Sequence, residues 1–241
     1  MEPIKLLKTT VFASLIVQII TGILNIGVAA FDFKAFTFSD ESKILVKLLW
    51  LAIFVQIIEG IFYVWLANSF DFVKNITVYR YYDWFITTPT MLFTIIAFMV
   101  YKNKQNEEKE SDIEKNTSIK QIFSENKNTI LLILLLNAIM LMFGFLGEKK
   151  KISRNAGFLY GSIAFCGAFY LMYVKFVNNV LINKQTFWFN FILWALYGVA
   201  YKLSYKNQNI AYNILDIFSK NLNGLLIFGY IYFLKYNGGF L

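Results

Sequence analysis

The stretch Leu215-Asp216-Ile217-Phe218-Ser219-Lys220-Asn221 decides the fold, because it carries two opposite charges inside a long apolar segment, residues 209–234. A helix of that length crosses about 30 Å of hydrocarbon at about 1.5 Å per residue. Asp216 and Lys220 stand four residues apart and therefore share one helical face. Charges within a membrane are costly and usually functional, so we expect this helix to carry a site.

The rest of the chain has the composition of a membrane domain. Of its 241 residues, 58% are hydrophobic and 16% are charged, whereas a soluble domain has about a quarter of its residues charged. We therefore predict an all-α fold, a seven-transmembrane-helix bundle that forms a single domain over residues 1–241. The polar segment 103–127 is expected to be partly helical or disordered. The other six apolar stretches are 9–31, 43–67, 79–101, 129–147, 157–177 and 185–204.

The composition also excludes several kinds of site. The chain has no histidine, which removes His-based metal centres and Ser–His catalysis. Its single cysteine, Cys166, stands in an apolar run and is expected to be a small core residue. The net charge of +8 is spread over the loops, so we expect solvated loops rather than a nucleic-acid patch. We expect no metal site and no enzymatic activity.

Five ionisable residues stand deep inside the apolar stretches: Glu59, Arg80, Asp83, Asp216 and Lys220. Salt bridges that only lock helices together would be poor stabilisers, because desolvation offsets most of the Coulomb gain. A buried lysine can instead act as a nucleophilic amine that condenses with an aldehyde as a Schiff base. Once protonated, that link needs a counter-ion, and Asp83 and Asp216 supply two carboxylates. Arg80 balances the surplus negative charge.

Four motifs carry a resemblance to a known family. Arg80-Tyr-Tyr-Asp-Trp-Phe-Ile-Thr-Thr-Pro89 resembles the third-helix signature of microbial rhodopsins, and Leu215-Asp-Ile-Phe-Ser-Lys220 resembles their retinal-lysine signature. Trp194-Ala-Leu-Tyr197 resembles the retinal wall of the sixth helix, and Met140-Leu-Met-Phe-Gly-Phe-Leu-Gly147 resembles the fourth helix. The likeness covers all seven stretches in order. It implies an extracellular N-terminus, a cytoplasmic C-terminus and an all-trans retinal on Lys220 that isomerises on illumination.

The resemblance also implies which residues surround the chromophore. Two positions depart from the family pattern: Gly198 stands where a proline is usual, and Tyr201 stands where many members have a second tryptophan. Besides the two counter-ions, the residues expected to bind retinal are Arg80, Trp84, Thr87, Thr88, Met91, Met140, Gly144, Trp194, Tyr197 and Tyr201.

A light-driven proton pump needs a proton acceptor near the lysine and a donor on the cytoplasmic side. Asp83 can be the acceptor. The donor position, three turns further along the same helix, holds Thr94, which cannot deliver a proton rapidly at neutral pH. The segment 201–215 contains no Asp or Glu that could release a proton outside. Pumping would therefore be slow.

Glu59 favours a channel instead. With Tyr63 aligned to the tyrosine of the second helix, Glu59 stands at the position of the central-gate carboxylate of channelrhodopsins. Ser14, alone among apolar residues, and Asn221 resemble the other two members of that gate. We expect Ser14 and Asn221 each to hydrogen-bond Glu59, so that the three close a water path in the dark.

A second polar pair, Thr88 and Asn137, resembles the interhelical link that slows channel closure in the same family. Ala52 stands where many channelrhodopsins have another carboxylate, so a small conductance is expected. The short chain most resembles the viral channel-type rhodopsins.

The sequence therefore predicts a light-gated cation channel, with a light-driven outward proton pump or a sensory rhodopsin as alternatives. The transported cations would be protons, with sodium and calcium as further candidates. We expect a homo-oligomer in the lipid bilayer of a plasma membrane or host cell membrane, and no nucleic-acid partner.

Overall fold

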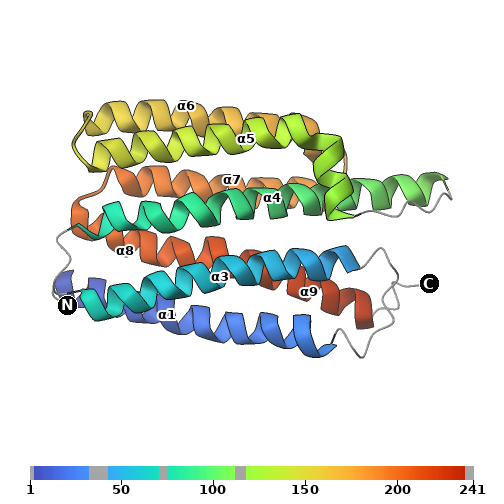
Figure 1. The fold of residues 1–241 in the computed structure, drawn as a ribbon, viewed down its shortest axis with the longest axis horizontal. Helices are drawn as coiled ribbons and strands as arrows, with labels where there is room; N and C mark the ends of the chain where they lie inside the picture. The colour runs from blue at the N-terminus through green and yellow to red at the C-terminus, as the bar shows by residue number, and fades with distance from the viewer. Residues whose placement is uncertain (1–2, 33–42, 71–74, 112–117, 237–241) are drawn as a thin grey trace.

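The computed structural model describes residues 3–32, 43–70, 75–111 and 118–236, and these ranges are almost entirely helical. Figure 1 shows the helices packed side by side as long rods. Seven rods follow one another along the described residues, which confirms the predicted bundle. Their elements are α1 (Pro3–Gly27) with the π-helix η1 (Val28–Asp32), α3 (Lys43–Ser69), α4 (Ile76–Ser111), α5 (Ile119–Glu148), α6 (Arg154–Met172) with the π-helix η2 (Tyr173–Val177), α7 (Leu181–Tyr201), and α8 (Tyr205–Asp216) with the π-helix η3 (Ile217–Asn221) and α9 (Leu222–Tyr236).

The rods begin and end close to the limits of the apolar stretches, with one exception. α4 and α5 continue through most of the polar segment 103–127, of which residues 112–117 lie outside the described part. That segment contains no Gly or Pro to interrupt a helix. An ion pair between Lys104 Nζ and Glu125 Oε2, at 3.0 Å, joins the two extensions. The expectation of partial helix is confirmed.

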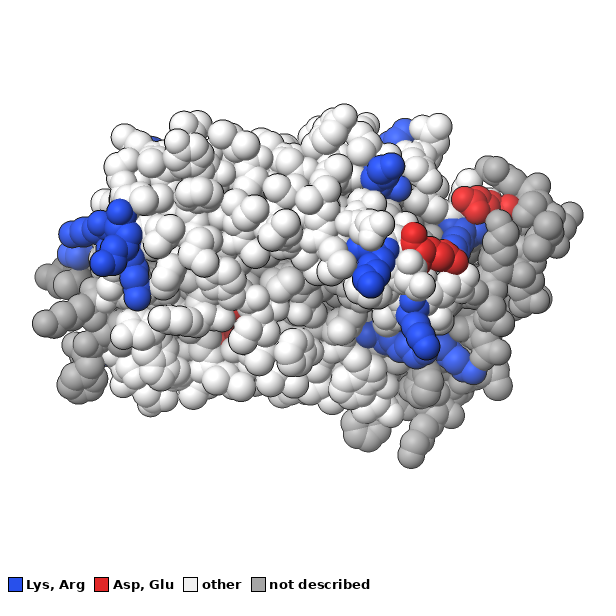
Figure 2. Space-filling model, turned by 45° about the horizontal axis from the view of Figure 1, so that its top comes forward, with Lys and Arg blue, Asp and Glu red and all other residues white. Residues whose placement is uncertain are grey.

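The surface of the bundle fits a bilayer. Charged side chains gather near the two ends of the molecule in Figure 2, and the surface between them is almost entirely uncharged. Isoleucine, leucine and phenylalanine side chains such as Ile23, Ile61 and Ile163 are more than half exposed there. Among the described residues, five helices are long and apolar enough to cross a membrane: Lys5–Ala30, Lys43–Ser69, Ile76–Glu107, Ile119–Glu148 and Arg154–Val177.

One prediction about α6 is wrong. Cys166 is exposed on that helix and is not a core residue. The reason is that an apolar helix in a bilayer has two apolar faces, and hydropathy alone does not say which of them packs against the protein.

Glycines set the spacing of α5, α6 and their neighbours. A Cβ atom at Gly144 would collide with the hydroxyl of Tyr81, and one at Gly147 or Gly157 would collide with the hydroxyl of Tyr201. These residues therefore let two large rings lie against α5 and α6. The rings form part of the wall of the cavity described below.

The last rod changes its winding at the functional lysine. α8 ends at Asp216, and the π-helix η3 carries Lys220 before α9 begins. Asp216 and Lys220 are both buried. A single π-turn inside an α-helix is rare and is frequent at functional sites.

Candidate functional site

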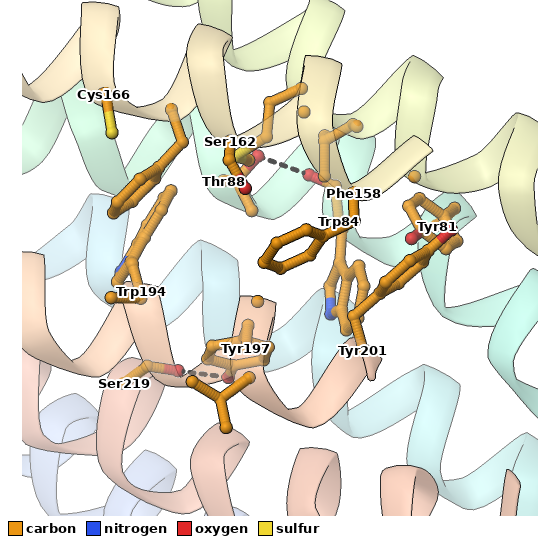
Figure 3. Close-up of a pocket in the computed structure, with 18 of the residues that line it drawn as sticks. Tyr81, Trp84, Thr88, Phe158, Ser162, Cys166, Trp194, Tyr197, Tyr201 and Ser219 are labelled. Atoms are coloured by element: carbon orange, nitrogen blue, oxygen red, sulfur yellow. Dashed lines mark hydrogen bonds between the residues drawn. The ribbon is translucent and has the colours of Figure 1, made fainter. Parts of the chain in front are cut away.

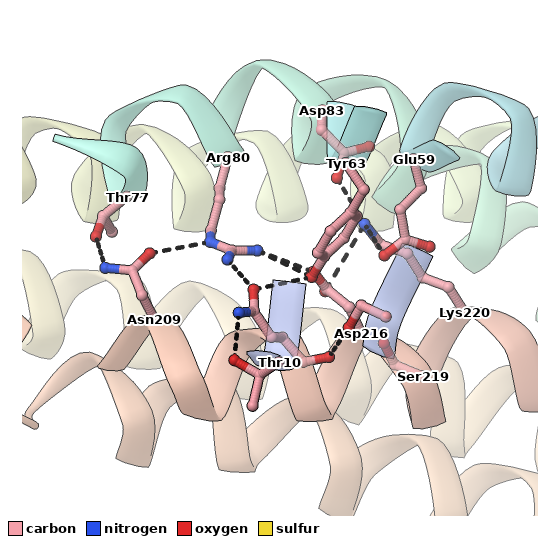
Figure 4. A network of polar contacts seen from close by, with 12 residues as sticks. Thr10, Glu59, Tyr63, Thr77, Arg80, Asp83, Asn209, Asp216, Ser219 and Lys220 are labelled. Atoms are coloured by element: carbon pink, nitrogen blue, oxygen red, sulfur yellow. Dashed lines mark hydrogen bonds and ion pairs between the residues drawn. The ribbon is translucent and has the colours of Figure 1, made fainter. Parts of the chain in front are cut away.

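Three carboxylates surround the Lys220 amine at the centre of the bundle. Lys220 Nζ lies 2.6 Å from Asp83 Oδ2, 3.2 Å from Glu59 Oε1 and 3.7 Å from Asp216 Oδ1. Figure 4 shows the amine between Asp83, which α4 contributes, and Glu59, which α3 contributes. All four side chains are buried, with exposures of 5% or less.

Asp216 is held by groups other than the lysine. Its Oδ2 accepts hydrogen bonds from the Tyr63 hydroxyl at 2.8 Å and from Arg80 Nη1 at 3.1 Å. Its Oδ1 accepts one from the Tyr197 hydroxyl at 2.7 Å. Asp83 differs, because its Oδ1 has no hydrogen-bond partner among the described residues and its Oδ2 faces the amine. Asp216 is therefore fixed in place, whereas Asp83 has a free oxygen.

A dense polar network continues from Asp216 toward the end of the bundle where α1 begins. Arg80 donates from Nε to Asn209 Oδ1 at 3.2 Å and from Nη2 to Asn213 Oδ1. Asn209 Nδ2 donates to Thr77 Oγ1 at 2.9 Å, and Asn213 Nδ2 donates to Thr10 Oγ1 at 2.8 Å (Figure 4). These bonds satisfy the buried guanidinium.

Tyr63, Asn209 and Asn213 were not predicted as site residues. A signal for the two asparagines exists in the sequence, since positions 209, 213, 216 and 220 repeat at the spacing of one helical face.

A cavity of about 370 Å³ extends from Lys220 between α4, α5, α6 and α7. In Figure 3 the rings of Trp84, Trp194 and Tyr197 lie around it, between Ser219 at one side and α6 at the other. Nine predicted chromophore residues can be placed against this wall. Those that line it are Trp84, Thr88, Met91, Met140, Gly144, Trp194, Tyr197 and Tyr201.

Thr87 is the exception, because it does not line the cavity. Its hydroxyl donates to the backbone carbonyl of Asp83 at 3.0 Å, within α4. Thr87 therefore turns back onto its own helix, as Thr side chains in helices often do.

The α6 side of the cavity was missed from sequence. Gly157, Phe158, Gly161, Ser162 and Phe165 line it, together with the exposed Cys166. Their spacing of three and four residues marks one face of α6. In a helix that is apolar all round, that spacing is visible only once the inward face is known.

The cavity fits an elongated apolar aldehyde such as retinal. Its wall is mainly aromatic and aliphatic, its size suits a small ligand, and the one amine that reaches it belongs to Lys220. The amine has a carboxylate at hydrogen-bond distance to balance its positive charge. Trp194 Nε1 is buried and has no hydrogen-bond partner in the described part of the chain, so this ring serves as apolar surface.

The three predicted gate residues lie in one region, but the predicted bonds between them are wrong. Ser14 Oγ donates to the backbone carbonyl of Asn213 at 2.6 Å. Asn221 Oδ1 accepts from Thr21 Oγ1 at 2.5 Å, and neither carboxylate oxygen of Glu59 accepts a hydrogen bond within the described residues. Ser14 and Thr21 are two turns apart on α1, so Ser14 and Asn221 lie at different depths and cannot both meet Glu59.

The second predicted pair does meet. Asn137 Nδ2 on α5 donates to Thr88 Oγ1 on α4 at 2.8 Å, and Thr88 in turn donates to the carbonyl of Trp84. Asn137 is buried, and its Oδ1 has no partner in the part of the chain that the structure describes. This bond ties the chromophore side of α4 to α5.

Comparison with known proteins places this site in a family. The sequence pattern of the family described as bacteriorhodopsin-like protein matches residues 11–233. Two solved structures share the fold: the viral rhodopsin OLPVRII (24% identity, TM-score 0.76, 93% of this chain and 97% of that one) and the blue light-absorbing proteorhodopsin from Med12 (17%, 0.69, 95% and 98%). No curated protein matches the chain. Because the family pattern spans all seven rods, this protein belongs to the bacteriorhodopsin-like family of microbial rhodopsins.

Proposed function

We propose that this protein, a retinal photoreceptor of the membrane, is a light-gated cation channel. The observation that carries the proposal is Glu59, a carboxylate with no exposure, 3.2 Å from Lys220 Nζ and without a hydrogen bond on either oxygen. A buried carboxylate that only stabilised the bundle would be hydrogen-bonded. Glu59 instead depends on the charge of Lys220.

The chain's own residues would hold and orient the chromophore. Lys220 Nζ provides the covalent attachment, and Trp84 and Trp194 provide flat apolar surface on the cavity wall. Bound there, all-trans retinal supplies absorption of visible light and a change of shape next to the Lys220 nitrogen. Asp216, held by Tyr63 and Arg80, keeps the charge on that side of the nitrogen constant.

Asp83 would take the proton from the Lys220 nitrogen. Its Oδ2 already accepts a hydrogen bond from Nζ at 2.6 Å, so the proton has a short path. When this proton moves, the lysine nitrogen loses its positive charge and the ion pair with Glu59 is lost. The carboxylate of Glu59 then needs water or a cation to replace that interaction, because an uncompensated buried charge is very costly. Water and cations would enter beside it.

Orientation follows from the resemblance to the family. We place the end where α1 begins outside the cell and the end of α9 inside, in a plasma membrane or host cell membrane. Protons are the first candidate for the transported cation, with sodium and calcium after them. The Thr88–Asn137 bond would set how fast the channel closes, since it couples α4 to α5.

An outward proton pump is the second candidate, because Asp83 is as well placed for a pump as for a channel. The route for returning a proton from inside is poor, however. Thr94 lines a second cavity on that side, and its hydroxyl donates to the carbonyl of Thr90 at 2.8 Å. No Asp or Glu is among the residues that line this cavity in the described chain. A pump built this way would be slow.

Voltage clamp separates these functions. The protein is expressed in a cell membrane with retinal, and the photocurrent is recorded while the holding voltage is stepped through zero. A channel gives a current that changes sign at the reversal potential of the permeant ion. A current that stays outward at every voltage contradicts the channel and supports the pump. A coloured protein without any current supports a sensory role.

A further inference from the structure

A polar stripe runs along one face of α1. Its members are Thr10, Ser14, Gln18, Thr21 and Asn25, at spacings of four, four, three and four residues, and the last four are buried with exposures of 5% or less. At about 1.5 Å per residue the stripe spans about 22 Å, most of the thickness of the hydrocarbon. Ser14 is therefore not an isolated polar residue in this helix.

The half of the stripe beyond Glu59 meets further polar side chains from α3 and η3. Thr21 Oγ1 donates to Asn221 Oδ1 at 2.5 Å, and Gln56 Nε2 lies 3.4 Å from each of these oxygens. Asn25 Nδ2 donates to Gln56 Oε1 at 3.1 Å. We call Gln18, Thr21, Asn25, Gln56 and Asn221 the amide seam. Every one of its side chains is uncharged.

The amide seam is not fully hydrogen-bonded. Both amide atoms of Gln18, Oδ1 of Asn25 and Nδ2 of Asn221 are buried without a partner among the described residues. Polar residues that only glue membrane helices together pair with one another. Unpaired buried amides are costly and call for an explanation, such as water or an ion that they can bind.

α9 presses on the seam at a glycine. A Cβ atom at Gly224 would lie 2.5 Å from Asn25 Nδ2 and 3.4 Å from Gln56 Nε2. Gly224 follows Lys220 by four residues, so both stand on the same face of the last rod. A movement of the lysine and its π-turn would therefore be passed directly to the Asn25–Gln56 pair.

The rival route on this side of Lys220 is apolar. A cavity of about 340 Å³ lies between α3, α4, α7 and α9 and also reaches Lys220. Its few polar members are already bonded: Thr94 donates to a backbone carbonyl, and Asn223 Nδ2 donates to Asn190 Oδ1 at 3.0 Å. A cation in this cavity would find almost nothing to replace its water.

We propose that the amide seam is the intracellular half of the cation path, and that the Asn25–Gln56 pair against Gly224 is the barrier that closes it in the dark. This inference rests on the channel proposed above. The neutral oxygens of the seam can stand in for part of the hydration shell of a passing cation, without a fixed charge that would trap it. Light opens the seam by moving η3 and releasing the pressure of Gly224.

The first test removes polar atoms on one route and on the other. Gln56→Leu and Thr21→Val change the seam, and Thr94→Val is the matched change in the apolar cavity. The photocurrent of the two seam variants should fall by about tenfold or more, because apolar side chains replace groups that solvate the cation. The visible band should remain, since it reports folding and retinal binding. Thr94→Val should keep the wild-type current.

The second test uses two glycines of α9. Gly224→Ala should displace the Asn25 amide and give a leak current in the dark. Gly229→Ala should give none, because a Cβ atom there meets no atom within 4 Å, although Gly229 lines the apolar cavity.

The outcomes separate the two proposals. A wild-type current that reverses, together with seam variants and Gly224→Ala that all behave as wild type, overturns the seam and leaves the channel. Loss of current in Thr94→Val but not in Gln56→Leu assigns the path to the apolar cavity. A wild-type current that never reverses overturns the channel, and the seam as an ion path with it.

Discussion

The two halves of the bundle interior, on either side of Lys220, are both polar but differ in how their polar groups are used. Toward the start of α1, the buried Arg80 and Asp216 are joined to Tyr63, Asn209 and Asn213 by short hydrogen bonds. Toward the end of α9, the amide seam has no charge and leaves several amide atoms unpaired. The first half is built to stay in place, and the second is built to rearrange.

The largest expected effect comes from removing the residue at the boundary of the two halves. Lys220→Ala should be expressed as a membrane protein and remain colourless with added retinal, because only Lys220 brings an amine to the cavity. Absorption spectra of the purified variant and wild type check this. A visible retinal band that survives in Lys220→Ala would remove the basis of the comparison.

Glu59→Gln tests whether the uncharged half depends on a single carboxylate. Its colour should stay close to that of wild type, since Glu59 does not line the retinal cavity. The photocurrent should change by about threefold or more, or shift its reversal potential when the outside pH is changed, because the path loses its one negative group. Recordings of both proteins under the same light decide the matter. An unchanged, strictly outward current in both would contradict the channel.

Asp83→Asn and Asp216→Asn sharpen the boundary itself. Asp83 lies 2.6 Å from Lys220 Nζ and Asp216 3.7 Å, and Asp216 is already shared with Arg80. Asp83→Asn should therefore shift the visible band to longer wavelengths at neutral pH, or move it to the near ultraviolet. Asp216→Asn should change the colour less. If Asp216→Asn alone shifts the band, the two roles are reversed.

The smallest expected effect is a difference in stability between the two halves. Asn213→Leu leaves donors of the buried Arg80 without an acceptor and should destabilise the protein by about 3 kcal/mol. Gln18→Leu removes two amide atoms that have no partner, so it should be neutral within about 1 kcal/mol or stabilising. Thermal loss of the visible band measures both. Equal destabilisation by the two changes would contradict the distinction.

Much of the fold could be predicted from the sequence, since a bilayer demands long apolar helices with few charges. Each of the seven predicted stretches became a rod, and the five ionisable residues chosen for their burial all lie in the interior. Hydropathy could not give the rotation of each helix about its own axis. That is why Cys166 was placed in the core and why the α6 side of the cavity, including Phe158 and Ser162, was missed.

Hydrogen-bond partners were harder to predict than positions. The pairing of Thr88 with Asn137 was anticipated by resemblance, but Ser14 was expected at Glu59 and instead bonds the Asn213 carbonyl. Depth along neighbouring helices decides such contacts, and a resemblance transfers residue identities without transferring depth. The polar stripe of α1 was also visible at its spacing of three and four, yet Ser14 was considered alone.

The π-turn at Ile217–Asn221 makes the last rod longer by one residue than its geometry requires. Each residue of an α-helix turns the chain by about 100°. Deleting one residue there, for example the exposed Phe218, would let the turn close to ordinary α-helix and rotate everything after it by roughly that angle. Gly224 would then face a different neighbour while Asp216 kept its own. The extra residue acts as an adjustable joint, through which insertions and deletions in this gene could re-aim α9 without disturbing α8.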